Sequence, residues 1–252
     1  MAVKIEVCAN SLESALNAQK GGAHRVELCA NLYEGGTTPS MGEINLAREL
    51  LHIELNILIR PRGGDFLYSK NEVEIIKRDI LSCKKIGVNG VVIGFLKLDG
   101  NIDTELTKEI TALARPMTVT FHRAFDMCKN PEKALEELIE IGVDRVLTSG
   151  LENKAIDGLA LLNKLVKQAN DRIIIMPGSG VRLSNISQLI QKTGASEFHL
   201  SERKNIPSKM TFKREHVFMG GLPQIPEYET RVIDDVMIGK IMEIVKDTDN
   251  AD

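Results

Sequence analysis

The chain has 252 residues and is nearly neutral, with 32 Lys and Arg against 35 Asp and Glu and a net charge of −3. It has no basic block that would neutralise a phosphate backbone, which argues against nucleic acid as a partner. No apolar run approaches the roughly 20 residues of a membrane span, and Glu6 stands where a signal peptide would be apolar. We therefore expect a cytoplasmic protein with no membrane partner.

Eight short β-branched runs alternate with helical patterns along the chain, about one βα unit apart. They cover residues 3–8, 25–29, 55–60, 90–94, 118–122, 145–149, 172–176 and 197–200. Helix starts are indicated by capping boxes at residues 10–13 and 69–72, and by Asn130 followed by Pro131. Each predicted strand is thus followed by a predicted helix.

An internal repeat indicates how these units assemble. The segments that begin at Gly22, Gly87, Gly142 and Gly194 align without a gap, and each has a glycine, a small apolar residue and then a strand. Glycine suits the left-handed position that often ends a helix. The four segments precede every second strand, so the repeat is a pair of βα units. Four pairs predict an α/β fold of the (β/α)8 TIM barrel type in a single domain.

The chain after the eighth strand departs from this pattern. We expect residues 1–201 to form the barrel core. Residues 202–228 hold three prolines and the pair Gly220-Gly221 without a helical period, and they predict an irregular excursion that serves as a lid or an interface. Residues 229–246 predict the final barrel helix, and residues 247–252 a disordered tail.

Side-chain alternation places an unusual number of charged groups inside the barrel, where Val, Ile and Leu are the rule. The inward candidates near the strand starts and centres are Lys4, Glu6, Arg25, Glu27 and Arg145. Buried charges need partners. These residues therefore either pair in a buried ionic network or line a site.

The loops that follow the strands predict an anion site, because active sites of this fold lie at that end. The Gly178-Ser179-Gly180 turn stands ahead of a predicted helix, whose backbone N–H groups could bind phosphate. Arg60, Arg62 and Arg123 could complete a clamp, although Arg62 and Asp65 could instead brace their own loop. The candidate anion-binding residues are Arg60, Arg62, Asp65, Arg123, Asp126, Ser149, Ser179, Gly180 and Ser201.

Two histidines, His122 and His199, end strands and point inward by the same alternation. Imidazole can act there as base, acid or ligand, although a lone buried histidine is often a core residue. With Glu6 and Glu27 nearby, these four are the candidate catalytic residues of an enzyme. Such an enzyme would be of the isomerase, lyase or hydrolase type and would act on a small anionic molecule.

Cysteine provides a second constellation. The four cysteines lack a CxxC pair, which argues against a disulfide framework. Cys8 and Cys29 stand in matching Glu-x-Cys-Ala-Asn segments on adjacent strands, which lie about 4.8 Å apart. Two inward thiols could bind a soft cation such as Cu(I) or Zn, or simply pack as small buried residues.

Several segments together resemble the CutC family, named for copper homeostasis. They are Glu6–Cys8, Glu27–Cys29, Glu34–Ser40, Ile59–Tyr68, Val119–Asp126, Arg145–Gly150 and Ile175–Gly178. The resemblance implies a cytoplasmic TIM barrel linked to copper tolerance or trafficking, with Cu(I) bound by Cys8 and Cys29. The expected partner is thus a copper ion or, for an enzyme, a small anionic molecule. Apolar helices on the rim add the expectation of a homodimer.

Overall fold

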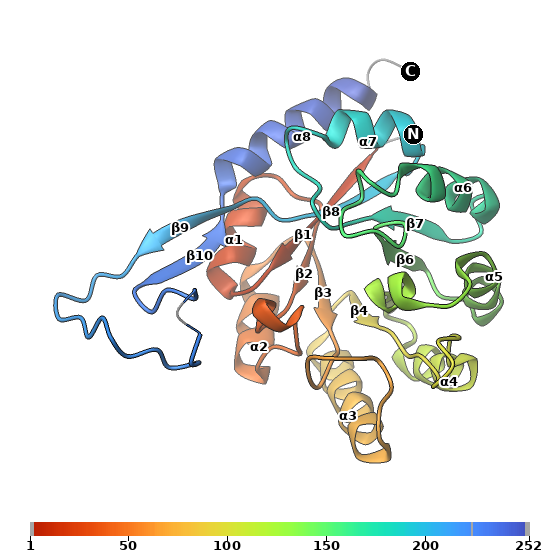
Figure 1. Cartoon of the computed structure of the whole chain (residues 1–252), viewed down its shortest axis with the longest axis horizontal. Coiled ribbons are helices and arrows are strands. Elements are labelled where there is room, and N and C mark those ends of the chain that lie inside the picture. The colour runs from red at the N-terminus through yellow and green to blue at the C-terminus, as the bar shows by residue number, and fades with distance from the viewer. Residues whose placement is uncertain (1–2, 223, 250–252) are drawn as a thin grey trace.

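The computed structural model describes residues 3–222 and 224–249 of the chain. Within them, eight parallel strands form a barrel in the order β7-β6-β5-β4-β3-β2-β1-β8, and β7 lies against β8 where the barrel closes (Figure 1). Helices surround these strands. The single-domain (β/α)8 barrel predicted from the sequence is confirmed.

The elements follow one another as the repeat predicts. The barrel strands are β1 (Lys4–Ala9), β2 (Arg25–Leu28), β3 (Glu54–Leu58), β4 (Gly90–Ile93), β5 (Thr118–Phe121), β6 (Arg145–Thr148), β7 (Ile174–Pro177) and β8 (Glu197–Leu200). The α-helices are α1 (Leu12–Lys20), α2 (Met41–Leu50), α3 (Lys70–Ile86), α4 (Thr104–Ala114), α5 (Pro131–Ile141), α6 (Leu159–Ala169), α7 (Ile186–Thr193) and α8 (Asp235–Asp249). Short 3-10 helices follow β2 and β5, at η1 (Leu32–Glu34) and η2 (Arg123–Met127).

Local sequence signals fix the helix ends. Ser69 and Glu72 form the predicted capping box of α3, and Asn130 caps α5 ahead of Pro131. For α1 the cap is Ser11 rather than Asn10. The four repeat glycines all have a positive φ, between 70° and 87°, which explains why glycine recurs there.

The strand residues that alternate away from the barrel interior pack under the helices. They are fully or almost fully buried and include Val26, Leu28, Val91, Ile93, Val146, Phe198 and Leu200. Burial of each such side chain contributes about 1.5–3 kcal/mol to folding. This outer core leaves the barrel interior free to hold polar groups.

The segment after β8 forms a projecting arm. Strand β9 (Arg203–Pro207) pairs antiparallel with β10 (Glu229–Ile233), and the arm of residues 203–233 extends sideways from the barrel (Figure 1). The predicted irregular start of the excursion and the predicted helix over 229–233 are therefore wrong. Helix α8 begins at Asp235.

Residues 247–249 belong to α8, so the predicted disordered tail is wrong there, and 250–252 lie outside the described residues.

Side-chain hydrogen bonds attach the end of β10 to α1 ahead of the last helix. Ser14 Oγ accepts the Ile233 N–H, and Asn17 donates to the Ile233 carbonyl, which fixes the end of β10 to α1.

None of the helices within the described residues combines the length and apolar character that a membrane crossing requires.

Candidate functional site

A buried ion network forms the floor of the site. Arg25 donates from Nε to Glu6 at 2.5 Å and also pairs with Glu197, whose carboxylate accepts from Arg145 Nε at 2.8 Å. The predicted pairing of Glu6 with Arg25 is confirmed, whereas Arg145 pairs with Glu197. Lys4 has the same parity as Glu6 on β1 but is exposed at the start of the strand, and no ion pair among the described residues joins it to this network.

His199 stands directly above this floor. Its Nδ1 lies 2.8 Å from Glu6 Oε1, as the pairing of β1 with β8 places Glu6 beside His199. Burial would raise the pKa of Glu6, but Arg25 and His199 hold it at about 2. Burial disfavours the charged ring of His199, yet Glu27, Cys8 and Glu6 raise its pKa well above the usual range. Glu6 therefore remains ionised and fixes the ring.

Two thiols meet at the upper end of β1. Cys8 Sγ and Cys29 Sγ are 3.7 Å apart, and Cys29 Sγ lies 3.5 Å from the Ala9 carbonyl. Cys29 is almost fully buried, whereas Cys8 is partly exposed. The contact with Cys29, and His199 in addition, holds the pKa of Cys8 well below its usual range despite burial. Contact with Cys8, together with burial, raises the pKa of Cys29.

The strand register brings a carboxylate to the same place. Cys8 pairs with Glu27, two residues before Cys29, so the matching Glu-x-Cys segments are shifted by two positions. Glu27 is buried, and its Oε2 has no hydrogen-bond partner within the described part of the chain. Burial raises the pKa of Glu27 to about 8. One ligand atom each from Cys8, Glu27 and His199 lies within 4.8 Å of the other two.

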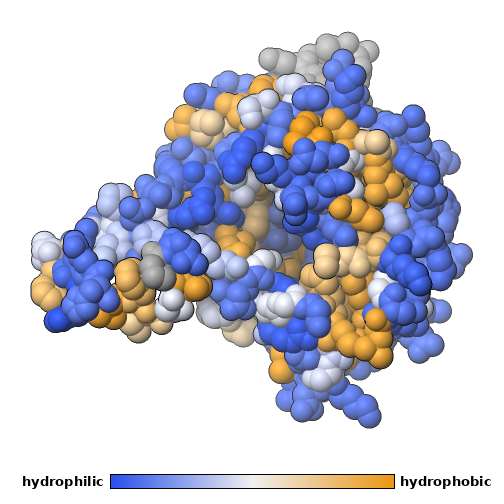
Figure 2. Space-filling model, in the orientation of Figure 1, coloured by the Kyte–Doolittle hydropathy of each residue, from blue (hydrophilic) through white to orange (hydrophobic). Residues whose placement is uncertain are grey.

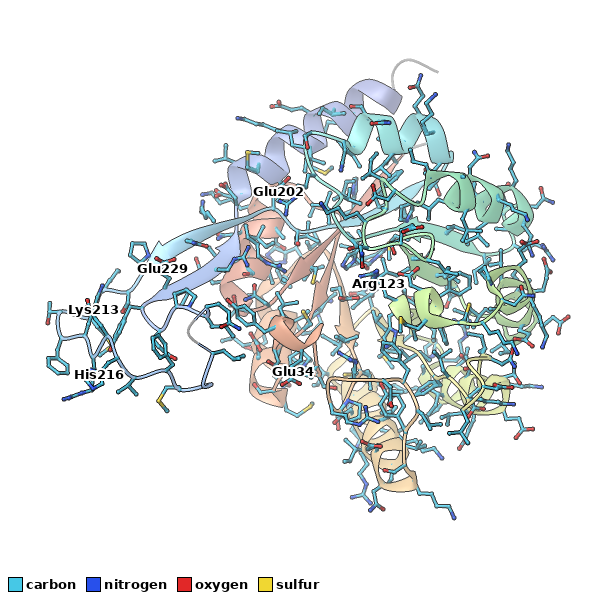
Figure 3. All side chains as sticks on the ribbon, viewed as in Figure 1. Glu34, Arg123, Glu202, Lys213, His216 and Glu229 are labelled. Carbon is cyan, nitrogen blue, oxygen red and sulfur yellow. The ribbon has the colours of Figure 1, made fainter. Side chains whose placement is uncertain are left out.

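These three residues line a cavity of about 780 Å³ at the carboxyl ends of the strands. Its walls are largely apolar. They include Leu58, Phe66, Leu67, Leu96, Leu98 and Leu147. Arg123, also on the wall, lies over the barrel in Figure 3. The arrangement is typical of a small-molecule or ion site with a few polar groups at its base.

His122 lies on another side of the cavity, as predicted. Its Nδ1 accepts the Ala124 N–H at 3.1 Å, and its Nε2 has no partner among the described residues. Burial, together with the nearby charge of Arg60, lowers its pKa to about 3. The ring is therefore neutral, and Nε2 carries a free N–H.

The predicted arginine clamp is engaged in loop contacts. Arg60 donates to the backbone carbonyls of Glu34, Gly36 and Gly64. No described residue accepts a hydrogen bond from its Nε. The guanidinium thus holds the loops after β2 and β3 together.

Arg62 binds Glu72 at 2.6 Å and Asp65 at 3.1 Å. It also donates to the carbonyls of Gly63, Asp65 and Leu67. This is the loop-bracing alternative that the sequence left open.

Arg123, Asp126 and Ser149 form a second bracing cluster. Arg123 Nε donates to Asp126 at 2.7 Å, and its NH2 group donates to Ser149 Oγ at 2.9 Å. Asp126 also accepts the Thr148 hydroxyl and the backbone N–H of Ser149. The structure thus brings these three candidate anion-binding residues together, but their polar groups bond to one another.

The Gly178-Ser179-Gly180 turn does not lie at a helix N-terminus as predicted, because α7 begins at Ile186, after residues 181–185. Ser179 Oγ donates to the Asn153 carbonyl, and Ser201 is half-buried just after β8.

Glu202, which the sequence did not indicate, accepts the Leu183 N–H at 3.0 Å and lies 3.2 Å from Arg182 NH1. Its only sequence signal is an acidic residue directly after the eighth strand. A carboxylate of the protein thus occupies the region where an anion was expected.

A model of the CutC family matches residues 3–204. A CutC family protein of Parabacteroides distasonis is 52% identical over 227 residues, which cover 90% of this chain and 93% of that protein. The copper homeostasis protein cutC homolog of Homo sapiens is 46% identical over 242 residues, 96% of this chain and 89% of that protein. The crystal structure of a CutC protein from Streptococcus agalactiae has a TM-score of 0.75 at 36% identity and covers 78% of this chain and 97% of that one.

Proposed function

Because the chain belongs to the CutC family, we propose that it is a cytoplasmic copper-homeostasis protein that binds Cu(I) through Cys8 and Cys29. The observation that carries this proposal is the 3.7 Å separation of the two Sγ atoms beside the cavity. Thiolates are soft ligands and select Cu(I) over harder cations. A pair of sulfurs this close can contact one ion with little movement of the strands.

The two cysteines have different roles in the proposed binding. Cys8 lines the cavity, and its low pKa supplies a thiolate to an incoming ion. Cys29 lies behind it and must release its proton when the ion binds. Copper binding is therefore expected to weaken as the pH falls.

Anaerobic Cu(I) titration of the reduced protein tests this function. We expect one tight site in the wild type and its loss in Cys8→Ser and in Cys29→Ser. Cys83→Ala is the matched control, because Cys83 lies on α3 in the outer core and not in the cavity. Equal binding in the wild type and in both serine variants would contradict the proposal.

A second candidate function is an enzyme of the isomerase, lyase or hydrolase type. Its support is the cavity itself, where Glu27 Oε2 and the His122 Nε2–H group are buried and find no partner among residues 3–222 and 224–249. A copper carrier needs neither group. In this alternative Glu27 or His199 exchanges the proton of the substrate, and the neutral His122 donates a hydrogen bond to it.

Crystals grown with phosphate or sulfate test whether the substrate of such an enzyme is anionic. An anion on Arg60, Arg62 or Arg123, or at Gly180, would support it. A cavity without an anion under those conditions would overturn the anionic-substrate proposal. Because the three guanidinium groups already bind carbonyls or carboxylates of the protein, we expect them to bind an anion more weakly than unpaired arginines would.

We further propose that the arm serves an interface in a homodimer rather than a lid. None of its described residues lines the cavity, and Lys213 and His216 lie near its far end, away from Arg123 (Figure 3). Large apolar side chains are exposed on it beside hydrophilic ones (Figure 2). They include Met210, Phe212, Val217, Phe218 and Met219.

A further inference from the structure

Three side chains from different strands converge at the base of the cavity. Cys8, Glu27 and His199 come from β1, β2 and β8, and a ligand atom of each lies within 4.8 Å of the others. Glu27 is 5% exposed, and its Oε2 has no partner among the described residues. A buried carboxylate oxygen without a donor is costly. A cation placed between the three groups would satisfy it.

The surroundings of His199 are those of a metal ligand. Histidines that bind metal ions usually donate the other ring nitrogen to a carboxylate, which fixes the ring and its tautomer. Here Nδ1 lies 2.8 Å from Glu6, which Arg25 holds in turn. Nε2 is thereby left for the group formed with Cys8 and Glu27.

We propose that Cys8, Glu27 and His199 form a site for a divalent cation of the Zn²⁺ class, which shares Cys8 with the copper pair but has two other ligands. A thiolate, an imidazole and a carboxylate are together the ligand types of Zn²⁺, whereas Cu(I) prefers sulfur. All three residues line the cavity. Three protein ligands facing a cavity leave the fourth position for water or for an oxygen of a bound molecule, as in catalytic zinc sites.

The proposed site differs from the copper site in a way that can be tested. It needs Glu27 and His199, which the copper pair does not, and it does not need Cys29. Both sites use Cys8, so the two metals exclude each other. The divalent site does not depend on copper binding and can be present or absent on its own.

Co²⁺ and Zn²⁺ binding by the reduced full-length protein test the proposal. We expect Co²⁺ to give a sulfur-to-metal charge-transfer band in the wild type that Cys8→Ser abolishes. Glu27→Gln should lower Zn²⁺ affinity by about tenfold or more, since the loss of even an outer-shell partner costs 10–100-fold. Cys29→Ser should leave both signals nearly unchanged. Excess Cu(I) should remove the Co²⁺ band.

A matched control is Glu202→Gln, a buried carboxylate in the loops after the strands that contacts Arg182 and Leu183. Retained Cu(I) binding by Glu27→Gln shows that this variant is folded and that its loss of Zn²⁺ is local. The proposal is overturned if wild type lacks the charge-transfer band, or if Glu27→Gln binds Zn²⁺ as wild type does. It is also overturned if Cys29→Ser loses as much Zn²⁺ affinity as Glu27→Gln. Failure of the copper function alone would show as unchanged Cu(I) binding in Cys29→Ser.

Discussion

Arg25 is the side chain on which the buried charges of the barrel depend. It is 1% exposed and pairs with Glu6 and Glu197. Arg25→Met keeps much of the volume but removes the cation that two buried carboxylates share, which leaves Glu197 with Arg145 and Glu6 with His199. We expect a loss of about 3–5 kcal/mol in the free energy of unfolding, measured by urea denaturation.

The control for Arg25 is Arg78→Met, which removes an exposed pair with Glu74 on α3. That change should cost no more than about 1 kcal/mol. Similar losses in the two variants would show that the floor network does not require Arg25.

His122 makes stability depend on pH in a defined direction. Its pKa is lowered from 6.5 to about 3 by burial, so the unfolded chain binds a proton that the folded protein does not. Its contribution is complete above about pH 6.5 and is lost as the pH falls, by up to about 1.4 kcal/mol per pH unit.

Nitrogen NMR of the His122 ring gives a direct measurement. We expect a neutral ring at pH 5, protonated on Nε2, because Nδ1 accepts the Ala124 N–H. A ring that titrates near pH 6.5 would contradict this assignment.

The sequence predicted the residues of the site better than their contacts. Alternation along β1, β2 and β8 correctly placed Glu6, Glu27 and His199 inside the barrel, since it requires only the position of each strand. The partners of each residue depend on the register between strands, which the repeat does not determine. The predicted approach of the Cys8 and Cys29 thiols is confirmed at 3.7 Å, but in the strand register Cys8 lies opposite Glu27, which the matching segments did not indicate.

At the scale of elements, the arm shows where local pattern was insufficient. Strand β9 pairs only with β10 among the described strands, and they are separated by residues 208–228. A strand of this kind is defined by its distant partner and not by a βα repeat. The sequence therefore predicted irregular structure at β9 and helix at β10. The family match ends at residue 204, near the start of the arm.

Shortening the arm tests its role as an interface. Residues 209–227 would be replaced by an Asn-Gly turn between Ser208 and Tyr228, which already bond through Ser208 N–H and the Tyr228 carbonyl. We expect a shift from dimer to monomer in sedimentation velocity, with unchanged Cu(I) binding. A persistent dimer would contradict the interface, and loss of Cu(I) binding would indicate a role at the cavity.

Across the whole molecule, the barrel could be predicted but the loops at its mouth could not. Eight strands and four helix-ending glycines suffice to indicate a closed parallel sheet. The sequence predicted an anion clamp of loop arginines and left open that Arg62 braces its own loop, but Arg60, Arg62 and Arg123 all bind carbonyls or carboxylates of the loops. Such contacts depend on loop conformation, for which the sequence carries no periodic signal.

The proposed chemistry depends on three levels of the barrel interior. An ionic floor holds Glu6 and His199, the thiols and Glu27 lie above it, and an apolar cavity opens over them. Thiolates at the base of a largely apolar cavity favour a soft ion such as Cu(I). The proposed copper binding by both cysteines rests on this arrangement.

X-ray absorption spectroscopy of the anaerobic, Cu(I)-loaded protein tests that claim most directly, because it counts the sulfur atoms bound to the metal. We predict two sulfur ligands in the wild type and in Cys83→Ala, and loss of this two-sulfur signal in Cys29→Ser, which lacks the tight site. A wild-type spectrum with one sulfur ligand or none, or one that Cys29→Ser does not change, would contradict copper binding by the cysteine pair.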